Sequence, residues 1–171
     1  TGSGKTYTMQ GPGFEKDVRA GKQKIELNPK SMGIIPRVLS DIFKIVEKSS
    51  RHIEYLLFAS YVEIYCERVM DLITPEKENL TILEDKGKGL WIMDATEVPV
   101  KNMDEVAAVM KIGMSNRFTA ATRMNKFSSR SHAVFLLTIY KRDLSSQINK
   151  SAQLYLVDLA GSEKVSKTES K

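Results

Sequence analysis

The chain has 171 residues, of which 42% are hydrophobic and 27% are charged, and this composition is typical of a globular domain with a real core. No apolar run approaches the roughly 18 residues that cross a bilayer, and the first residues lack the layout of a signal peptide, so we expect a cytoplasmic protein without membrane insertion. The formal net charge of +5 favours an acidic partner, such as nucleic acid, a membrane surface or an acidic protein polymer, although surplus surface lysine explains it equally well.

The single cysteine, Cys66, can form no internal disulfide. It lies in an apolar run, and free cysteines in such runs behave as small hydrophobic residues. We therefore expect a buried, inert thiol at this position.

The first residues, TGSGKT from Thr1 to Thr6, match the end of the phosphate-binding pattern G-x-x-x-x-G-K-[ST]. Glycine lets backbone N–H groups approach phosphate oxygens, the Lys5 ammonium places a positive charge on the outer phosphates, and the Thr6 hydroxyl is a magnesium ligand. The opening glycine of the pattern and the strand that feeds such a loop would precede Thr1. We therefore expect the sequence to be a piece of a longer protein.

The first third of the chain predicts two helices followed by a strand. A helix is expected over residues 4–9, where Gly11-Pro12-Gly13 ends it, and the polar residues 14–31 predict an exposed loop. Apolar residues at helical spacing predict a second helix over residues 34–48. The β-branched and aromatic run over residues 53–66 predicts a long strand whose centre is buried on both faces.

The middle of the chain predicts shorter elements. Residues 69–72 are expected to form one helical turn, and residues 80–83 with 90–93 a hairpin. A capping box at residues 102–105 opens a helix that ends near Ala121. Its methionines are expected to pack in the core rather than to bind a ligand.

The last third combines polar segments with apolar strands. The hydroxyl-rich segment NKFSSRSH (residues 125–132) precedes a near-continuous apolar run over residues 133–140, which predicts a central strand. Residues 143–151 are expected to be a polar connector. Residues 154–158 (LYLVD) predict a strand that ends on the carboxylate of Asp158, and LAGSE (residues 159–163) turns away from it.

Each of these segments alone has a purely structural explanation, but in this order they supply the parts of a nucleotide-hydrolysing site. Phosphoryl transfer needs positioning and charge neutralisation, and the carboxyl ends of strands meet where ligands bind in an open α/β sheet. We therefore expect Lys5, Ser129 and Asp158 to surround one triphosphate. The hydroxyls of Thr6 and Ser129 would bind Mg²⁺ directly, and Asp158 would bind its water shell.

Two further features predict a response to the γ-phosphate. Gly161 has no side chain, so its backbone N–H can approach that phosphate closely. Arg130 and Glu163 carry opposite charges on separate loops. An ion pair between them would form a gate that closes only when the γ-phosphate is present.

Three segments carry a resemblance to the motor domains of kinesins. They are TGSGKTYTM (residues 1–9), NKFSSRSH (125–132) and LVDLAGSEKV (156–165), which resemble the phosphate loop and the two switch segments of that family. Weaker similarity lies at residues 33–37, 61–65 and 115–117. The chain looks closest to the conventional heavy chain.

The resemblance implies a fold and an activity. The fold would be α/β, of the P-loop NTPase type, with a mixed central sheet and helices on both faces, incomplete at both ends. Residues 1–171 would be part of one motor domain, which begins inside the phosphate loop and ends just after the second switch. The protein would hydrolyse ATP with Mg²⁺, stimulated by microtubules, and move along them in the cytoplasm. It would dimerise through regions outside this sequence and would not bind nucleic acid.

The resemblance also assigns residues to roles. The nucleotide contacts would be Thr1, Gly2, Ser3, Gly4, Lys5, Thr6 and Tyr7. The catalytic group would be Ser128, Ser129, Arg130, Gly161 and Glu163, in which the two serines orient the attacking water and the metal. The magnesium site would consist of Thr6, Ser129 and Asp158. The contacts to tubulin would be Arg68, Lys86, Lys88, Lys164 and Lys167.

The sequence also departs from the family pattern. The loop over residues 11–31 is longer than usual, and Glu169 follows Thr168 where the family commonly has glycine. The adenine-contacting segment, the first strands, the main microtubule-docking helix and the neck are missing. We therefore expect that the 171-residue chain neither folds stably nor moves along microtubules by itself.

Three other functions remain open at this point. The first is a different P-loop NTPase, such as a switch-type GTPase or a myosin-like motor, although no guanine-reading Asn-Lys-x-Asp stretch occurs. The second is a nucleotide-binding microtubule module without motility. The third, a nucleic-acid-binding domain, rests on charge alone.

Overall fold

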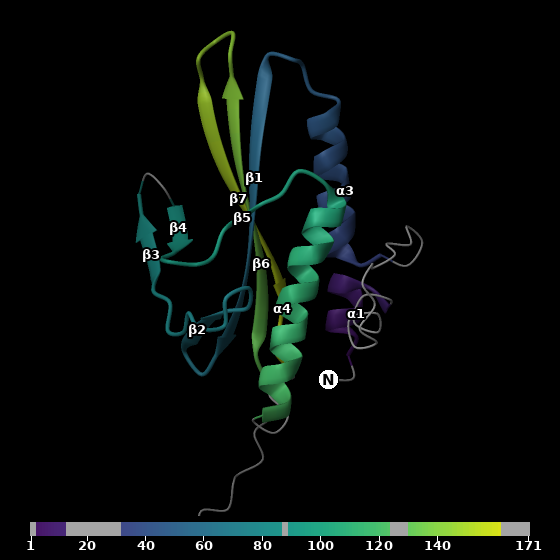
Figure 1. Cartoon of the computed structure of the whole chain (residues 1–171), viewed down its shortest axis with the longest axis vertical. Helices are drawn as coiled ribbons and strands as arrows, with labels where there is room; N and C mark the ends of the chain where they lie inside the picture. Colours follow the sequence, from purple (N-terminus) through teal and green to yellow (C-terminus); the bar gives the residue numbers. More distant parts are fainter. Residues whose placement is uncertain (1–2, 13–31, 87–88, 124–129, 162–171) are drawn as a thin grey trace, which may run out of the picture.

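The computed structural model describes residues 3–12, 32–86, 89–123 and 130–161. Of the described elements, two helices at the start of the chain are followed by strands, and α4 comes between β5 and β6 (Figure 1). In chain order they are α1 (Lys5–Gln10), α3 (Ile34–Glu47), β1 (Ile53–Tyr65), β2 (Arg68–Asp71), β3 (Ile82–Asp85), β4 (Gly89–Ile92), β5 (Val98–Pro99), α4 (Met103–Arg123), β6 (His132–Asp143) and β7 (Asn149–Asp158).

The main sheet has the strand order β2-β1-β6-β7, and the short β5 pairs with β1. All of these pairs are antiparallel. The strand β1 is apolar and β-branched, and its centre from Tyr61 to Glu63 is buried, as the sequence predicts. The long strands therefore provide the frame on which the other elements are placed.

The turn between β1 and β2 corrects two expectations from the sequence. Tyr65 pairs with Arg68, so the loop has only two residues, and both Cys66 (φ 47°) and Glu67 (φ 62°) have positive φ. Such a turn continues the twist of its strands, so the following residues form the strand β2 and not the helical turn expected at residues 69–72. The predicted burial of Cys66 is also wrong, because the tip of this hairpin exposes the thiol.

The strands β6 and β7 are longer than their apolar runs. Register pairs such as Arg142 with Asn149 carry the ladder into the segment that was expected to be a connector. That expectation was wrong for Asp143 and for residues 149–151, whereas residues 144–148 do connect the two strands. Where the faces of a strand are open to water, polar side chains do not end it, because the backbone groups still form their hydrogen bonds with the neighbouring strand.

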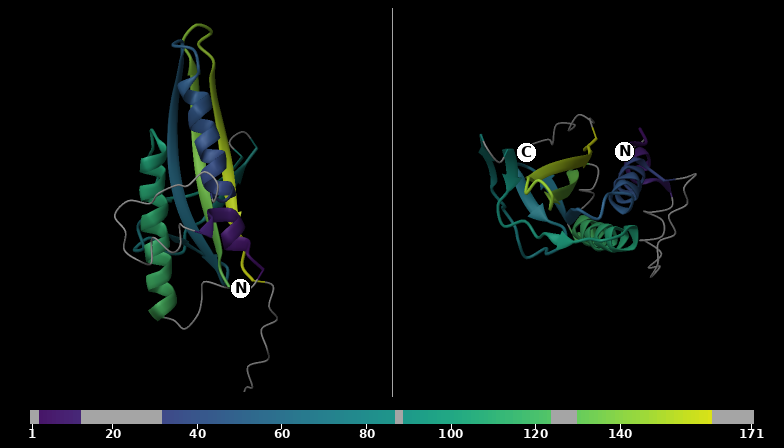
Figure 2. Two further views of the ribbon diagram at one scale, coloured as in Figure 1. Left: turned by 90° about the vertical axis from the view of Figure 1, so that its right-hand side faces the viewer. Right: turned by 90° about the horizontal axis from the view of Figure 1, so that it is seen from above.

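Helices α1, α3 and α4 lie on one face of the main sheet (Figures 1 and 2). The buried residues of α3 recur at helical spacing, at Ile35, Leu39 and Phe43, and pack in the same core as Met110 of α4 and Phe135 of β6. Met110 is 1% exposed, which confirms that a methionine of α4 packs in the core.

The opposite face of the sheet is covered by the β3–β4 hairpin (Figure 2). Val62, Val69 and Val134 form a second, smaller core there, against which Leu80 and Ile92 pack. Among the described residues this face carries a hairpin rather than a helix. Helices on this second face and parallel strand pairs are thus not among the elements that the structure describes.

The helix α4 begins with the expected capping box. The backbone N–H of Glu105 donates to Asn102 Oδ1 at 2.9 Å, and the Glu105 carboxylate accepts from the Lys101 N–H at 2.7 Å. The first bond satisfies a donor that a helix start leaves unpaired, and the second pairs a backbone donor just before the helix. Of the helices that the structure describes, none is long and apolar enough to cross a membrane.

Candidate nucleotide site

The phosphate-binding pattern turns into helix α1 at Gly4. Gly4 has φ 73°, a conformation that is strained for residues with a side chain, and Lys5 begins the helix directly after it. The Lys5 Nζ donates to Ser3 Oγ at 2.8 Å. The loop therefore brings an ammonium group to the start of the short helix, as the pattern predicts.

The next residue, Thr6, joins this loop to the end of strand β7. Its hydroxyl donates to Asp158 Oδ2 at 2.8 Å, across 152 positions of sequence. Asp158 is the last residue of β7 and is 1% exposed. Its second oxygen, Oδ1, is buried and has no hydrogen-bond partner among the residues that the structure describes. A buried carboxylate oxygen without a partner is costly, and it marks the place where a further polar group is expected.

The sheet register places a second carboxylate near Asp158. Ala133 of β6 pairs with Glu63 of β1 on one side and with Asp158 of β7 on the other. Directly paired residues point to the same face of a sheet, so both carboxylates face α4. The small side chain of Ala133 leaves space between them.

The guanidinium of Arg117 on α4 connects the two carboxylates across Ala133. Its Nε lies 3.1 Å from Glu63 Oε1 and its Nη1 lies 3.5 Å from Asp158 Oδ2. All three side chains are at most 8% exposed. Because water is excluded, each charge depends on its partners. Arg117 therefore holds Asp158 in place from the helix side.

The start of β6 is part of the same cluster. Arg117 Nη2 donates to the backbone oxygen of Ser131 at 3.1 Å, and the Ser131 hydroxyl donates to the Glu63 carboxylate. Ala160 N donates to His132 Nδ1 at 3.1 Å. The residues before β6 and those after β7 thus meet at one end of the sheet, beside α1.

The structure describes only some of the predicted site residues. Arg130 is exposed in a turn two residues before β6, and Gly161 is half-buried beyond the end of β7. The exposed Arg68 and Lys86 lie on β2 and after β3. The predicted residues outside the described ranges are Thr1, Gly2, Lys88, Ser128, Ser129, Glu163, Lys164 and Lys167.

Sequence reasoning assigned no role to Glu63, Arg117 and Ser131, which form the buried cluster. A signal was present, because Glu63 lies in the part of a largely apolar strand that was expected to be buried, and charged residues are almost never fully buried unless they are paired. The segments that contain Glu63 and Arg117 did contribute to the family resemblance. Which arginine of the chain would meet Glu63 depends on the packing of α4 and cannot be read from the sequence.

The oxygen donors of this site suit magnesium. Mg²⁺ is usually held by one or two protein oxygens together with phosphates and water. The Thr6 hydroxyl and the unpartnered Asp158 Oδ1 provide such oxygens. Within the described ranges there is no group of three or more His, Cys, Asp or Glu that could hold a metal ion by itself. The residues present therefore fit a magnesium ion that shares its ligands with a bound nucleotide.

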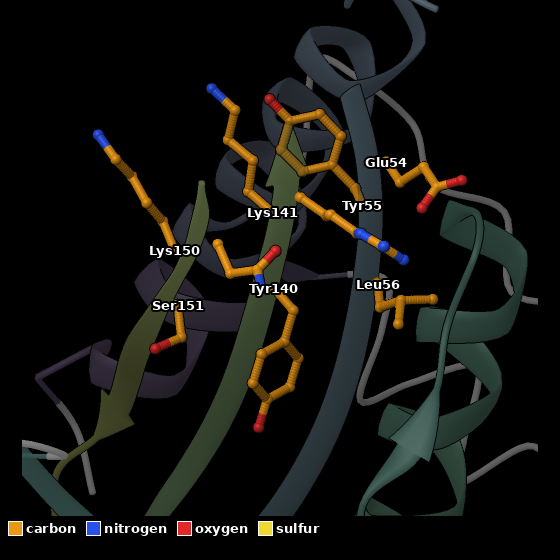
Figure 3. Close-up of a pocket in the computed structure, with 9 residues that line it drawn as sticks. Glu54, Tyr55, Leu56, Tyr140, Lys141, Lys150 and Ser151 are labelled. Atoms are coloured by element: carbon orange, nitrogen blue, oxygen red, sulfur yellow. The ribbon is translucent and has the colours of Figure 1, made fainter. Parts of the chain in front are cut away.

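A cleft of about 780 Å³ lies elsewhere, at the far ends of β1, β6 and β7. Figure 3 shows Leu56 and Tyr140 pointing away from the strands there, with Lys141 and Lys150 beside them. None of its lining residues belongs to the phosphate loop or to the buried cluster. The candidate site is thus the end of the sheet where α1 meets Asp158.

A phosphate loop that opens a helix, joined to a carboxylate at a strand end, defines the class of P-loop NTPase folds. The comparisons then identify the family. A family model described as "Kinesin motor domain" matches residues 1–171, so the chain belongs to the kinesin motor-domain family. The resemblance drawn from the sequence is thereby confirmed.

Individual relatives agree with this assignment. The chain is 43% identical to Kinesin-related protein 3 of Dictyostelium discoideum over 171 residues, 98% of this chain and 13% of that protein. It is 42% identical to Kinesin-1 heavy chain of Homo sapiens over 168 residues, 98% of this chain and 16% of that protein. The chain therefore spans less than a fifth of the length of these relatives.

A solved structure also matches. It is described as the structure of a fast kinesin, with implications for its ATPase mechanism and its interactions with microtubules. The two are 42% identical, with a TM-score of 0.85 over 99% of this chain and 45% of the other. This match confirms the predicted α/β fold of the P-loop NTPase type.

Proposed function

We propose that the protein is an ATP-dependent microtubule motor, which hydrolyses ATP with Mg²⁺ and couples hydrolysis to movement along the filament. The hydrogen bond from Thr6 to Asp158 carries the proposal, because it joins the phosphate loop to a buried carboxylate that has one oxygen to spare. Family membership supports the same function. The solved kinesin structure that matches this chain is described with implications for its ATPase mechanism and its interactions with microtubules.

Lys5 and Thr6 would act directly on the phosphates. The Lys5 ammonium would neutralise charge that develops on the outer phosphate oxygens, and the Thr6 hydroxyl would bind the metal. Asp158 would orient the water shell of the metal, and Arg117 holds the Asp158 carboxylate from the helix side. When bound, the metal would supply charge stabilisation at the transferring phosphate.

The other predicted residues complete this proposal. Ser128 and Ser129 would orient the attacking water and the metal, and Gly161 would donate its backbone N–H to the γ-phosphate. Arg130 and Glu163 would pair when the γ-phosphate is present. The remaining nucleotide contacts would be Thr1, Gly2, Ser3, Gly4 and Tyr7.

The partner is proposed to be the microtubule, which is an acidic polymer. Arg68 and Lys86 are exposed cations that could meet it. Lys88, Lys164 and Lys167 are proposed as further contacts. The protein would work in the cytoplasm as a dimer and would bind no nucleic acid.

Microtubule-stimulated ATPase activity of the full-length protein tests the proposal. Lys5→Ala and Asp158→Asn should each lower the stimulated rate at least about 100-fold, because single preorganised charge interactions are worth that much at such sites. Lys48→Ala, which changes an exposed lysine at the end of α3, is the matched control and should leave the rate unchanged.

Two results would contradict the proposal in different ways. If Lys5→Ala and Asp158→Asn both keep the stimulated rate of the parent, the catalytic assignment is wrong. If the parent binds MgATP and microtubules but shows no turnover, the protein is a nucleotide-binding microtubule module without motility.

A further inference from the structure

The phosphate-loop helix α1 is held at both of its ends by side chains on different strands. At its start, Thr6 donates to Asp158 of β7 at 2.8 Å. At its end, Gln10 is 2% exposed, and its Nε2 donates to the phenolic oxygen of Tyr61 on β1 at 3.4 Å. Within the described part of the chain, the Gln10 Oε1 is buried without a hydrogen-bond partner, and the bond to Tyr61 is the side-chain hydrogen bond that the structure shows for this amide.

The backbone restrains the same end of α1. The N–H of Gly33 donates to the Gln10 carbonyl at 3.3 Å. A Cβ at Gly33 would lie 2.5 Å from the carbonyl carbon of Gln10 and from the carbonyl oxygen of Met9. Real Cβ atoms do not approach other atoms this closely, so the backbone before α3 is already in contact with the end of α1. The end of α1 cannot move further toward α3.

The ring of Tyr61 is equally constrained. It packs edge-on against Phe135, with the ring centroids 5.7 Å apart, and the residue is 1% exposed. On the helix side it faces Gly113 of α4, where an added Cβ would lie 2.2 Å from the ring atom Cδ1. The phenolic oxygen is therefore fixed between the sheet and α4. Because Gln10 hydrogen-bonds to this oxygen, the oxygen also fixes the end of α1.

Tyr61 also keeps its proton throughout the range in which proteins are folded. Burial raises the pKa of its hydroxyl to about 12, against an opposing effect from the Arg117 charge. Gly113 and Arg117 lie one turn apart on α4 and so share a face of that helix. One turn of α4 thus contacts the tyrosine that holds the end of α1 and the carboxylate that holds its start.

We propose that Tyr61 is a positioning residue that fixes the phosphate-loop helix relative to Asp158, so that the loop and the carboxylate receive the phosphates of a magnesium nucleotide as one rigid unit. This inference rests on the proposed function. In this role Tyr61 acts on α1 through its hydrogen bond with Gln10.

Steady-state kinetics of the full-length protein with MgATP test this inference. In Tyr61→Phe the ring remains and only the hydrogen bond is lost, so the KM for MgATP should rise about fivefold, the effect of one hydrogen bond. The maximal rate should change by less than about twofold, because no group that contacts the reacting phosphate is altered. Tyr140→Phe is the matched control, since Tyr140 lies on the other face of the sheet and is 44% exposed.

A second variant separates positioning from stability. Tyr61→Phe leaves the buried Gln10 amide without its partner and should lower the thermal midpoint. Gln10→Leu combined with Tyr61→Phe leaves no polar atom unpaired between them, so the midpoint should return toward that of the parent. The KM for MgATP should nevertheless stay high, because the hydrogen bond that fixes α1 to Tyr61 is still absent. A KM that returns together with the thermal midpoint would show that the pair serves folding alone.

The remaining outcomes are also decisive. An unchanged KM in Tyr61→Phe overturns the inference. If that variant does not fold, Gln10→Leu alone is measured, in which the Tyr61 ring keeps its packing. This variant must raise the KM, and a KM equal to that of the parent overturns the inference. A parent protein that does not turn over MgATP would instead contradict the proposed function.

Discussion

Arg117 shows how single residues govern this site. It is the cation that lies between two buried carboxylates, Glu63 and Asp158, and its side chain is 8% exposed. Buried charges are tolerated only in pairs with good geometry, because each one has lost its hydration. The direction in which Asp158 points is therefore set by a helix residue that lies 41 positions before it.

Replacing this arginine should destabilise the protein strongly. Arg117→Met keeps much of the packing volume but leaves Glu63 and Asp158 without their cation, and the free energy of unfolding should fall by about 3–5 kcal/mol. Denaturant unfolding of the full-length protein's motor domain, compared with its parent, measures this loss. The exposed Arg51 provides the control, since Arg51→Met should change stability by less than about 0.5 kcal/mol. A loss below about 1 kcal/mol for Arg117→Met would contradict the buried ion cluster.

At the scale of elements, α4 depends on its first turn. The helix contributes Gly113 and Arg117 to the site, and its start is fixed by the reciprocal bonds of Asn102 and Glu105. A well-made start fixes the position of the later turns along the helix axis. The capping box is thus a local feature with an effect on a distant site.

Loss of the cap should be measurable. Asn102→Ala removes the acceptor for the Glu105 N–H, and stability should fall by about 1 kcal/mol, as at other helix starts. Asn102→Asp, which keeps the acceptor, should retain most of that stability. Thermal or denaturant unfolding distinguishes the two variants. Equal stability of Asn102→Ala and the parent would mean that the cap contributes nothing.

At the scale of the whole molecule, Lys86, one of the proposed microtubule contacts, and the helix α3 lie on opposite sides of the sheet. Lys86 follows β3 in the hairpin that covers one face, and α3 packs on the other (Figure 2). Attraction to an acidic filament acts over about a Debye length and weakens with salt. Charges on the two faces should therefore contribute unequally to filament binding.

Cosedimentation of the full-length protein with microtubules tests this difference. Lys86→Ala should weaken binding about threefold at low salt and make it less dependent on salt, because exposed charges mainly act through long-range attraction. Lys48→Ala, which removes a lysine at the end of α3, should have little effect. If Lys86→Ala and Lys48→Ala weaken binding equally, the net charge of the protein matters and the location of Lys86 does not.

The fold could be predicted from the sequence where local patterns are strong. The strand at residues 53–66, the helices that begin near Ile34 and Asn102, and the hairpin near residues 80–93 all occur where their patterns indicate. The errors arose where a turn, and not a propensity, decides the structure. Cys66 and its neighbours form a two-residue turn with positive φ, which makes residues 68–71 a strand and exposes the thiol.

The sequence by itself determined the phosphate loop, the carboxylate at the end of a strand and the membership of the kinesin motor-domain family, because these depend on short runs of neighbouring residues. Only the tertiary structure decided that Thr6 meets Asp158, that Arg117 lies between two carboxylates and that Tyr61 holds Gln10. These contacts follow from the register of β1, β6 and β7 and from the packing of α4 on them. A register brings distant residues together, and no local pattern records which ones will meet.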